Sequence, residues 1–361
     1  MSKKNILEVC LSPDLGGLEL FVINCFNFFK NDTKSLIVVT PNSKMDSYIG
    51  DEKEKITLKR NKFFPLLPAL KLASIIDKND MDIVHFHWTK DMPTVVLAKL
   101  LSRKKPKLVQ TRNMHITRFK SDFYHKWLYK NISTIHAVTN QVKEELTKYI
   151  PKEVRPKIEV VYMGVKEPQK DLETDDLKEK YNLQDDFIVG IIGRIEDAKG
   201  QKILIEALEK LKDLKIKVLI IGHTMDEEYL KNLKRYTKDL GLEEKVIFTG
   251  FTKEVERHLK LCDVTVLATQ NETFGLVVVE SMINKVPVIA TNNGGPLEII
   301  DDQKDGILFD RTAGDLAKKI KYLYENREYL EKLSQNAYKK AVEKFLYEKQ
   351  LEKLKKVLYE S

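Results

Sequence analysis

The sequence predicts an α/β protein with two domains, each built around a parallel sheet. Thirteen short apolar segments, rich in β-branched residues, alternate with longer amphipathic stretches along the 361 residues. Segments of this apolar density, separated by helices, are typical of parallel strands buried on both faces. The length suits two domains of about 150–180 residues. Its hydrophobic content of 42% lets both halves bury a core.

The apolar segments are expected to be strands, seven in the first half and six in the second. They span 6–11, 36–40, 56–58, 83–87, 108–111, 135–139, 158–162, 187–193, 216–222, 246–249, 264–268, 286–290 and 307–309. Helical patterns lie between them, for example at 201–211 and 227–240. The stretch 156–186, with Gly164, Pro168 and a charged run, indicates a linker, so the domains are expected to span 1–164 and 165–344.

Charge is spread unevenly along the chain. Residues 1–164 carry 28 Lys and Arg against 17 Asp and Glu, a net charge of +11, whereas the rest carries 34 against 37, a net of −3. The basic centre is 95–130, where only Asp122 is acidic. This region is either solvated surface or a surface for an anionic partner, such as lipid headgroups or a phosphate-bearing acceptor. Nucleic acid is disfavoured because no aromatic-interleaved basic motif accompanies the region.

The sequence also limits where the protein is expected to work. Its first residues have no apolar core of signal-peptide length, and no run of about 18 apolar residues occurs. Cys10, Cys25 and Cys262 lie far apart without metal-ligand spacing, which is typical of buried thiols in a reducing compartment. A cytoplasmic protein that is not integral to a membrane is therefore expected.

Glycine pairs follow two of the predicted strands. Gly16 and Gly17 open an apolar helix pattern, where a ligand can approach the backbone and the first N–H groups can bind an anion. A plain packing turn is the alternative. The pattern is not GxGxxG, so a dinucleotide site is poorly supported. Gly294, Gly295 and Pro296 follow a later strand as a tight turn before a helix.

The loop 193–200 directly follows the strand at 187–193. Arg194 can hold one phosphate with two parallel hydrogen bonds, and Lys199 can offer a point charge to a second. The carboxyl edge of a parallel sheet is also where α/β folds bind ligands. The loop therefore suits a diphosphate, with a solvated loop as the alternative.

Two glutamates frame the segment after the strand at 264–268. Asn271 or Thr273 is expected to cap a helix whose exposed first turn, residues 274–276, offers free N–H groups. Glu272 lies in the loop and can bind sugar hydroxyls, while Glu280 lies about two turns into the helix and can reach a ribose. The alternative is that Glu280 merely faces water on an amphipathic helix.

In their order and spacing, these segments resemble the retaining glycosyltransferases of family 4, the glycosyl transferases group 1. The resemblance spans nearly the whole chain and is most specific in 187–310, although Thr273 stands where the family often has glycine. It implies the GT-B fold, in which two Rossmann-like domains face each other across a cleft and close over the donor. It also implies that the final helix, about 345–361, returns to the first domain, the acceptor side.

Roles follow from the resemblance residue by residue. Arg194 and Lys199 would hold the donor diphosphate and stabilise the leaving charge, and Glu272 would position the donor sugar. Glu280 would bind the ribose. The implied donor-binding set is Gly16, Gly17, Arg194, Lys199, Phe274, Gly275, Leu276 and Glu280.

Three histidines fall on the acceptor side. His85 and His87 end a strand as His-x-His and point to the same side. His85 is expected to pack or to hydrogen-bond the backbone, whereas His87, with Arg112, could line the acceptor side. His115 matches the position of an active-site histidine in the family and would hydrogen-bond the transferred sugar.

The reaction implied is transfer of a sugar from a nucleoside diphosphate, with UDP favoured, to an acceptor hydroxyl, with retention and without a metal or other cofactor. Cell-surface polysaccharide, lipopolysaccharide or glycolipid assembly is the expected setting. Two alternatives are a nucleotide-sugar epimerase of the same fold and a non-catalytic protein that binds membrane surfaces.

The stretch 61–68 is apolar, bounded by prolines and flanked by basic residues. With the basic region 95–130, it could dock at an anionic membrane face, which favours a lipid-linked or lipopolysaccharide-type acceptor and peripheral attachment at the inner membrane face. Ordinary packing of residues 63–67 at a helix entry is the alternative.

Overall fold

A computed structural model describes residues 3–61, 64–169 and 172–360, and the chain divides into two compact units. Unit 1 comprises Met1–Tyr162 and Gln350–Ser361, and unit 2 comprises Met163–Lys349. The sequence-based limits, 164 and about 345, lie within five residues of these boundaries.

The sheet of unit 1 has seven parallel strands in the order β3-β2-β1-β4-β5-β6-β7. The strands are β1 Ile6–Cys10, β2 Ser35–Val39, β3 Lys55–Thr57, β4 Ile83–Phe86, β5 Lys107–Arg112, β6 Thr134–Ala137 and β7 Lys157–Val160. The direction of strand addition reverses between β1 and β4. In an open α/β sheet, ligands bind beyond the carboxyl ends of the strands at such a point.

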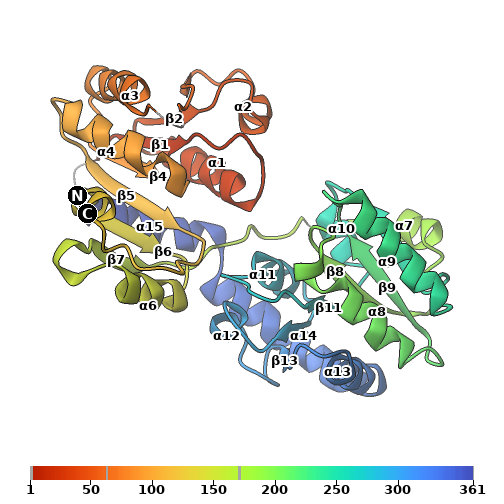
Figure 1. Ribbon diagram of the computed structural model, residues 1–361. Coiled ribbons are helices and arrows are strands. Elements are labelled where there is room, and N and C mark those ends of the chain that lie inside the picture. The colour runs from red at the N-terminus through yellow and green to blue at the C-terminus, as the bar shows by residue number, and fades with distance from the viewer. Residues whose placement is uncertain (1–2, 62–63, 170–171, 361) are drawn as a thin grey trace. The chain divides into compact units, whose positions relative to one another are not determined.

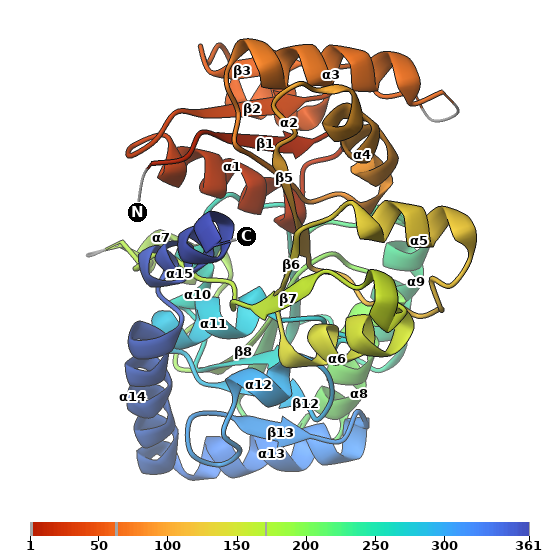
Figure 2. The ribbon, with the colours of Figure 1, turned by 90° about the vertical axis from the view of Figure 1, so that its left-hand side faces the viewer.

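Helices cover both faces of this sheet. They are α1 Gly17–Phe29, α2 Lys44–Ile49, α3 Leu66–Lys78, α4 Met92–Leu101, α5 Phe123–Lys130, α6 Asn140–Tyr149 and α15 Tyr347–Glu360. Figure 2 shows α1 and α15 on one side of the strands and α4 and α5 on the other. The last helix, α15, is tied to this unit by an ion pair between Lys355 and Asp32 and by a hydrogen bond from Lys4 to the Tyr359 carbonyl.

The sheet of unit 2 has six parallel strands in the order β10-β9-β8-β11-β12-β13 (Figure 1). The strands are β8 Phe187–Ile192, β9 Ile216–Ile221, β10 Val246–Gly250, β11 Val264–Leu267, β12 Val288–Thr291 and β13 Ile307–Phe309. The helices are α7 Asp175–Lys180, α8 Gln201–Glu209, α9 Glu227–Asp239, α10 Val255–Leu259, α11 Leu276–Ile283, α12 Pro296–Ile299, α13 Ala313–Glu325 and α14 Arg327–Lys344. Here the order reverses between β8 and β11.

All thirteen predicted strands are present, and their apolar side chains form the cores. In unit 2, Val189, Val218 and Ile289 from three strands are fully buried with Leu204 of α8 and Leu316 of α13. Burial on both faces explains why these strands are nearly continuous apolar runs, as parallel sheets require. The three cysteines are buried and unpaired. No helix within 3–61, 64–169 or 172–360 is long and apolar enough to cross a membrane.

Candidate active site

In unit 2, the loops after β8 and β11 meet at the reversal point of the sheet. The backbone N–H of Gln270 donates to the Ala198 carbonyl at 2.9 Å, which joins the two loops. Lys199 Nζ lies 3.5 Å from Glu272 Oε2, so the cation of one loop pairs with the carboxylate of the other. The structure thus brings together two residues that are 73 positions apart in the chain.

The loop after β8 presents its two cations differently. The Arg194 side chain is 58% exposed and lies 3.5 Å from Glu196, whereas Lys199 is 28% exposed. The side-chain amide of Gln201 donates to the Arg194 carbonyl at 2.8 Å and holds the loop. Gly200 has a φ of +79°, and a Cβ there would lie 2.5 Å from the Ala268 carbonyl oxygen. Glycine at this position therefore permits the close approach of the two loops.

The Gly294–Gly295 turn supports the Glu272 segment from behind. The N–H of Gly295 donates to the Glu272 carbonyl at 2.8 Å. A Cβ on Gly295 would lie 2.3 Å from the Phe274 carbonyl oxygen, a distance that real Cβ atoms do not adopt. The turn after β12 therefore fixes the position of the Glu272 backbone. Pro296 is the first residue of α12, as predicted.

Helix α11 begins at Leu276, and its cap differs from the prediction. The expected caps, Asn271 and Thr273, are wrong: Gly275 is the cap residue, in the left-handed region with φ 98°, and no side chain caps the helix. Phe274 is buried, not exposed as expected, because it packs at 6.2 Å from the ring of Phe345. The N–H groups of Leu276 and Val277 have no hydrogen-bond acceptor within the described part of the chain.

Glu280 lies half-buried on α11. None of the hydrogen bonds or ion pairs among residues 3–61, 64–169 and 172–360 involves its carboxylate. Burial raises its pKa to about 7, with a smaller contribution from the charge of Glu256. Such a carboxylate gains stability from any hydroxyl donor that reaches it.

In unit 1, Gly16 and Gly17 lie beyond the carboxyl end of β1. Helix α1 begins at Gly17, and the N–H of Gly16 donates to the Glu19 carboxylate at 2.9 Å. Gly16 has an extended backbone, and a Cβ on Gly17 would meet nothing within 4 Å. Neither the backbone conformation nor the surrounding atoms therefore require glycine at these two positions. Both residues are exposed, and the space beside them is open.

His85 and His87 are buried and share one carboxylate that sequence reasoning missed. His85 Nδ1 lies 2.9 Å from Glu8 Oε1, and His87 Nε2 lies 2.7 Å from Glu8 Oε2. His85 packs in the core, as one of its two expected roles requires, but its hydrogen-bond partners are the side chains of Glu8 and, at 2.7 Å, Thr111 rather than the backbone. His87 is 2% exposed, and its ring packs 5.8 Å from that of Phe21.

The same network continues across the sheet and fixes where its protons lie. His136 Nε2 must donate to the Val161 carbonyl at 2.7 Å, and burial lowers the pKa of His136 to about 3, so its Nδ1 accepts from the Thr111 hydroxyl. Because the Thr111 hydroxyl gives its proton to His136, it must accept from His85 Nε2–H. The hydrogen bond between His85 Nδ1 and Glu8 then contains one proton, which the two side chains share. Glu8, His85 and His87 place possible metal ligands within 4.8 Å of one another, but hydrogen bonds account for this spacing.

Arg112 and His115 organise the loop after β5. Arg112 is buried; it donates to the carbonyls of Met114 and His115, both at 2.8 Å, and to the Thr89 hydroxyl. His115 Nδ1 lies 2.7 Å from the carboxylate of Glu145, which also accepts from the Ile116 N–H at 2.9 Å. Arg112 therefore holds the loop in place, and the His115 side chain remains 23% exposed.

Family models match both units. Glycosyl transferases group 1 matches residues 173–340, and Glycosyl transferase 4-like matches residues 8–140. The chain belongs to the family-4 type of group 1 glycosyltransferases. It is thus a glycosyltransferase, and the five loops described above, after β1, β5, β8, β11 and β12, lie inside the matched ranges.

Relatives and solved structures agree with this family. EpsD of Bacillus subtilis (strain 168), named as a glycosyltransferase, is 28% identical over 95% of this chain and 93% of its own length. The UDP-Gal:alpha-D-GlcNAc-diphosphoundecaprenol alpha-1,3-galactosyltransferase of Escherichia coli is 25% identical over 98% and 96%. HepE of Anabaena, solved with UDP and glucose, superposes with a TM-score of 0.86 over 99% of both chains at 20% identity, and the fold is GT-B.

Replacing Gly17 by Ala tests whether the open space beside the first loop of this glycosyltransferase serves the substrates. We expect the free energy of unfolding to change by less than about 0.5 kcal/mol, because Ala suits the first turn of a helix and no atom lies within 4 Å. We expect transfer to fall about tenfold, since a methyl group there obstructs a bound substrate. Thermal unfolding and kcat/KM measure the two effects, and unchanged kcat/KM would show that the space is not used.

Replacing Glu280 by Gln tests the raised pKa of this half-buried carboxylate through the pH dependence of stability. The folded-state pKa is about 7, above the ordinary value of 4.5, so the folded protein binds more protons between these values and loses stability as pH rises. We expect the Gln variant to match the wild type near pH 4.5 and to be more stable by about 2 kcal/mol at pH 8. Urea unfolding at both pH values measures this, and a pH-independent difference would contradict it.

Proposed function

We propose that this glycosyltransferase transfers a sugar from a nucleoside-diphosphate sugar, with a UDP-sugar favoured, to an acceptor hydroxyl, and that the anomeric configuration is retained. The pairing of Lys199 with Glu272, at the point where the loops after β8 and β11 meet, carries this proposal. It supplies a cation for phosphate and a carboxylate for sugar hydroxyls within a few ångströms. HepE, whose fold this chain shares, was solved with UDP and glucose, which supports the choice of donor.

Each chemical group of the donor (the two phosphates, the sugar and the ribose) is matched by a residue of the unit 2 loops. Arg194, exposed and paired only loosely with Glu196, is available to bind phosphate oxygens, and Lys199 can exchange its 3.5 Å contact with Glu272 for a second phosphate. Glu272 would then accept hydrogen bonds from the sugar. The unpaired N–H groups of Leu276 and Val277 suit a phosphate or sugar oxygen. Glu280 would accept from the ribose hydroxyls.

The proposed chemistry is attack on the same face from which the nucleoside diphosphate departs. The acceptor hydroxyl forms a bond to the anomeric carbon as the bond to the diphosphate oxygen breaks, and the departing phosphate takes the acceptor proton. Arg194 and Lys199 stabilise the negative charge that develops on the leaving group. We propose that these cations do this without a metal ion or another cofactor. His115, oriented by Glu145, would donate or accept a hydrogen bond at the transferred sugar.

The acceptor side is proposed to be unit 1, with Gly16, Gly17 and His115 near the substrates. His87 and Arg112 would act indirectly, because both are buried and already hydrogen-bonded. The acceptor is proposed to be a glycan or a lipid-linked glycan of cell-surface polysaccharide, lipopolysaccharide or glycolipid assembly at the cytoplasmic side. The diphosphoundecaprenol in the name of the E. coli relative supports a lipid-linked acceptor.

Donor turnover tests the proposal directly. Purified protein is incubated with UDP-, GDP- and ADP-sugars, with and without EDTA, and nucleotide release and the anomeric configuration of the released or transferred sugar are followed by NMR. We expect release from a UDP-sugar, unaffected by EDTA, with retained configuration. Inverted configuration would contradict the mechanism, and interconversion of intact nucleotide sugars without release would point to an epimerase.

A further inference from the structure

Apolar side chains are exposed just before α3 and on its first two turns, where a surface helix normally carries polar ones. Phe64 is 72% exposed, Leu66 51%, Leu67 66% and Leu70 47%. The opposite face of the helix is buried through Ala69, Leu72 and Ile76, so these leucines are not needed for the core. Later exposed positions of the same helix are polar. Of the predicted segment 61–68, Lys62 and Phe63 lie outside the described residues; Phe64, Leu66 and Leu67 do not pack at a helix entry.

The apolar group lies in strongly basic surroundings. Residues 58–76 contain four Lys and Arg and no Asp or Glu. Lys59, Lys71 and Lys90 are exposed, and both Lys90 and Arg60 lie over the Trp88 ring, at 4.9 and 4.8 Å from its centre. Exposed leucines, an amphipathic tryptophan and lysines together are the combination that binds an anionic membrane interface.

The surface is connected to the acceptor-side loops. Arg60 Nε lies 3.9 Å from Asp91 Oδ1, and Asp91 Oδ2 accepts from the Leu11 N–H at 2.8 Å. Leu11 follows β1 and leads into the loop that ends at Gly16. The start of α3 and the Trp88 turn are thus on the carboxyl edge of the sheet, where that loop lies.

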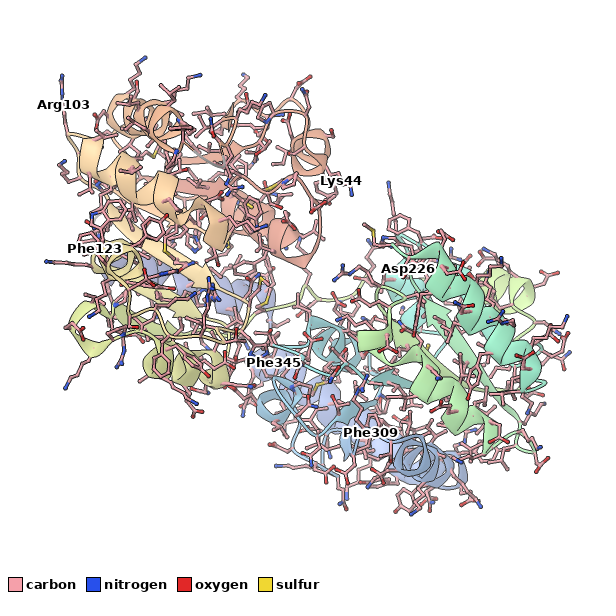
Figure 3. The ribbon with its side chains drawn as sticks, in the orientation of Figure 1. Lys44, Arg103, Phe123, Asp226, Phe309 and Phe345 are labelled. Atoms are coloured by element: carbon pink, nitrogen blue, oxygen red, sulfur yellow. The ribbon has the colours of Figure 1, made fainter. Side chains whose placement is uncertain are left out.

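The basic region 95–130, expected from the sequence as a docking surface, fits less well. It also exposes apolar side chains, Phe119 at 63% and Phe123 at 87%, and Figure 3 places Phe123 and Arg103 on the same side of unit 1. However, Asp122 lies beside Phe123, and Lys126 is paired with Glu153 at 2.9 Å. Arg112, the last residue of β5, is buried and bonded to the loop that follows. The unpaired positive charge of the region 95–130 is therefore smaller than the sequence suggested.

We propose that Phe64, Leu66, Leu67 and Leu70, with Lys59 and Lys90, form a docking surface for an anionic lipid bilayer, which we call the α3 surface. The leucines enter the headgroup region while the lysines contact lipid phosphates. This places the loop after β1 at the membrane and identifies the acceptor class as lipid-borne. Membrane docking of the α3 surface does not depend on the proposed reaction. Only the assignment of the acceptor class rests on that reaction.

Sedimentation of the full chain with vesicles tests the α3 surface. Vesicles of phosphatidylcholine with 30% phosphatidylglycerol at low salt are expected to bind the protein, and pure phosphatidylcholine vesicles are not. The variant Leu66→Ser/Leu67→Ser should bind about tenfold more weakly, whereas Phe123→Ser should bind as the wild type does. Failure to bind, equal binding to both vesicle types, or an unaffected double variant would each overturn the proposal.

Tryptophan quenching by brominated lipids provides a second readout that does not depend on the leucine variants. The chain has only Trp88 and Trp127, so Trp127→Phe and Trp88→Phe each leave one reporter. We expect strong quenching of Trp88 and little of Trp127, which lies on α5; the reverse would place docking at α5 and overturn the α3 surface. UDP affinity is measured in the same samples. Vesicle binding without UDP affinity would contradict the proposed reaction but not the docking.

Discussion

Replacing Glu272 by Gln is expected to lower transfer more than a hundredfold while the protein remains folded. Its carboxylate is 19% exposed, pairs with Lys199, and is the group proposed to bind the donor sugar. A neutral amide keeps the size but loses the charged acceptor, and removing a preorganised group of this kind costs about 3 kcal/mol in the transition state. Its fold should survive because Gly295 supports the backbone of Glu272, not its side chain.

Steady-state kinetics and thermal unfolding of the same preparation measure the two halves of this prediction. Glu325→Gln is the matched control, since that carboxylate is 52% exposed at the end of α13 in the same unit and pairs with Lys321. We expect the control to retain wild-type kcat/KM. Comparable kcat/KM for Glu272→Gln and the wild type would show that the donor site does not include this loop.

Replacing Lys199 by Ala is expected to weaken UDP binding about tenfold to a hundredfold and to leave uridine binding unchanged. The lysine is proposed to contact the diphosphate alone, and a charge-assisted hydrogen bond of this kind contributes about 1.5–3 kcal/mol. Loss of Lys199 also leaves Glu272 without its cation, which adds repulsion toward the diphosphate.

Calorimetric titrations with UDP and with uridine separate these effects. Lys202→Ala is the control, because that lysine is 53% exposed on α8 and only three residues away. If Lys199→Ala weakens the binding of UDP and of uridine equally, the loop supports the whole site and does not bind the phosphates specifically.

Much of the fold could be predicted because it depends on local patterns. Apolar runs such as 187–193 become strands, and the low-hydrophobicity stretch around Gly164 contains the boundary at Tyr162. Glycine-bearing strand ends, such as that before Arg194, indicated the loops of the candidate site. Parallel strands place their carboxyl ends at one edge, so the loops after β8 and β11 meet there.

What could not be predicted depends on contacts between distant residues. The expected cap of α11 rested on the local preferences of Asn271 and Thr273. Gly295 packs against Phe274, however, and the helix begins two residues later than expected, after Gly275. Glu145 binds His115 across 30 residues, and nothing in its local sequence indicates this.

Glu8 is different, because its sequence position did carry a signal. It stands in the otherwise apolar segment 6–11, and a buried carboxylate needs a partner, so a search for cationic or hydrogen-bonding residues on the neighbouring strand would have found His85 and His87.

Unit 2 is proposed to hold the diphosphate at the loop after β8 and the ribose at Glu280. A crystal structure with UDP tests it most directly. We predict phosphate oxygens within hydrogen-bonding distance of Arg194 and Lys199, and ribose hydroxyls within that distance of the Glu280 carboxylate. UDP bound elsewhere, or bound here with Glu280 still unpaired, would contradict the account.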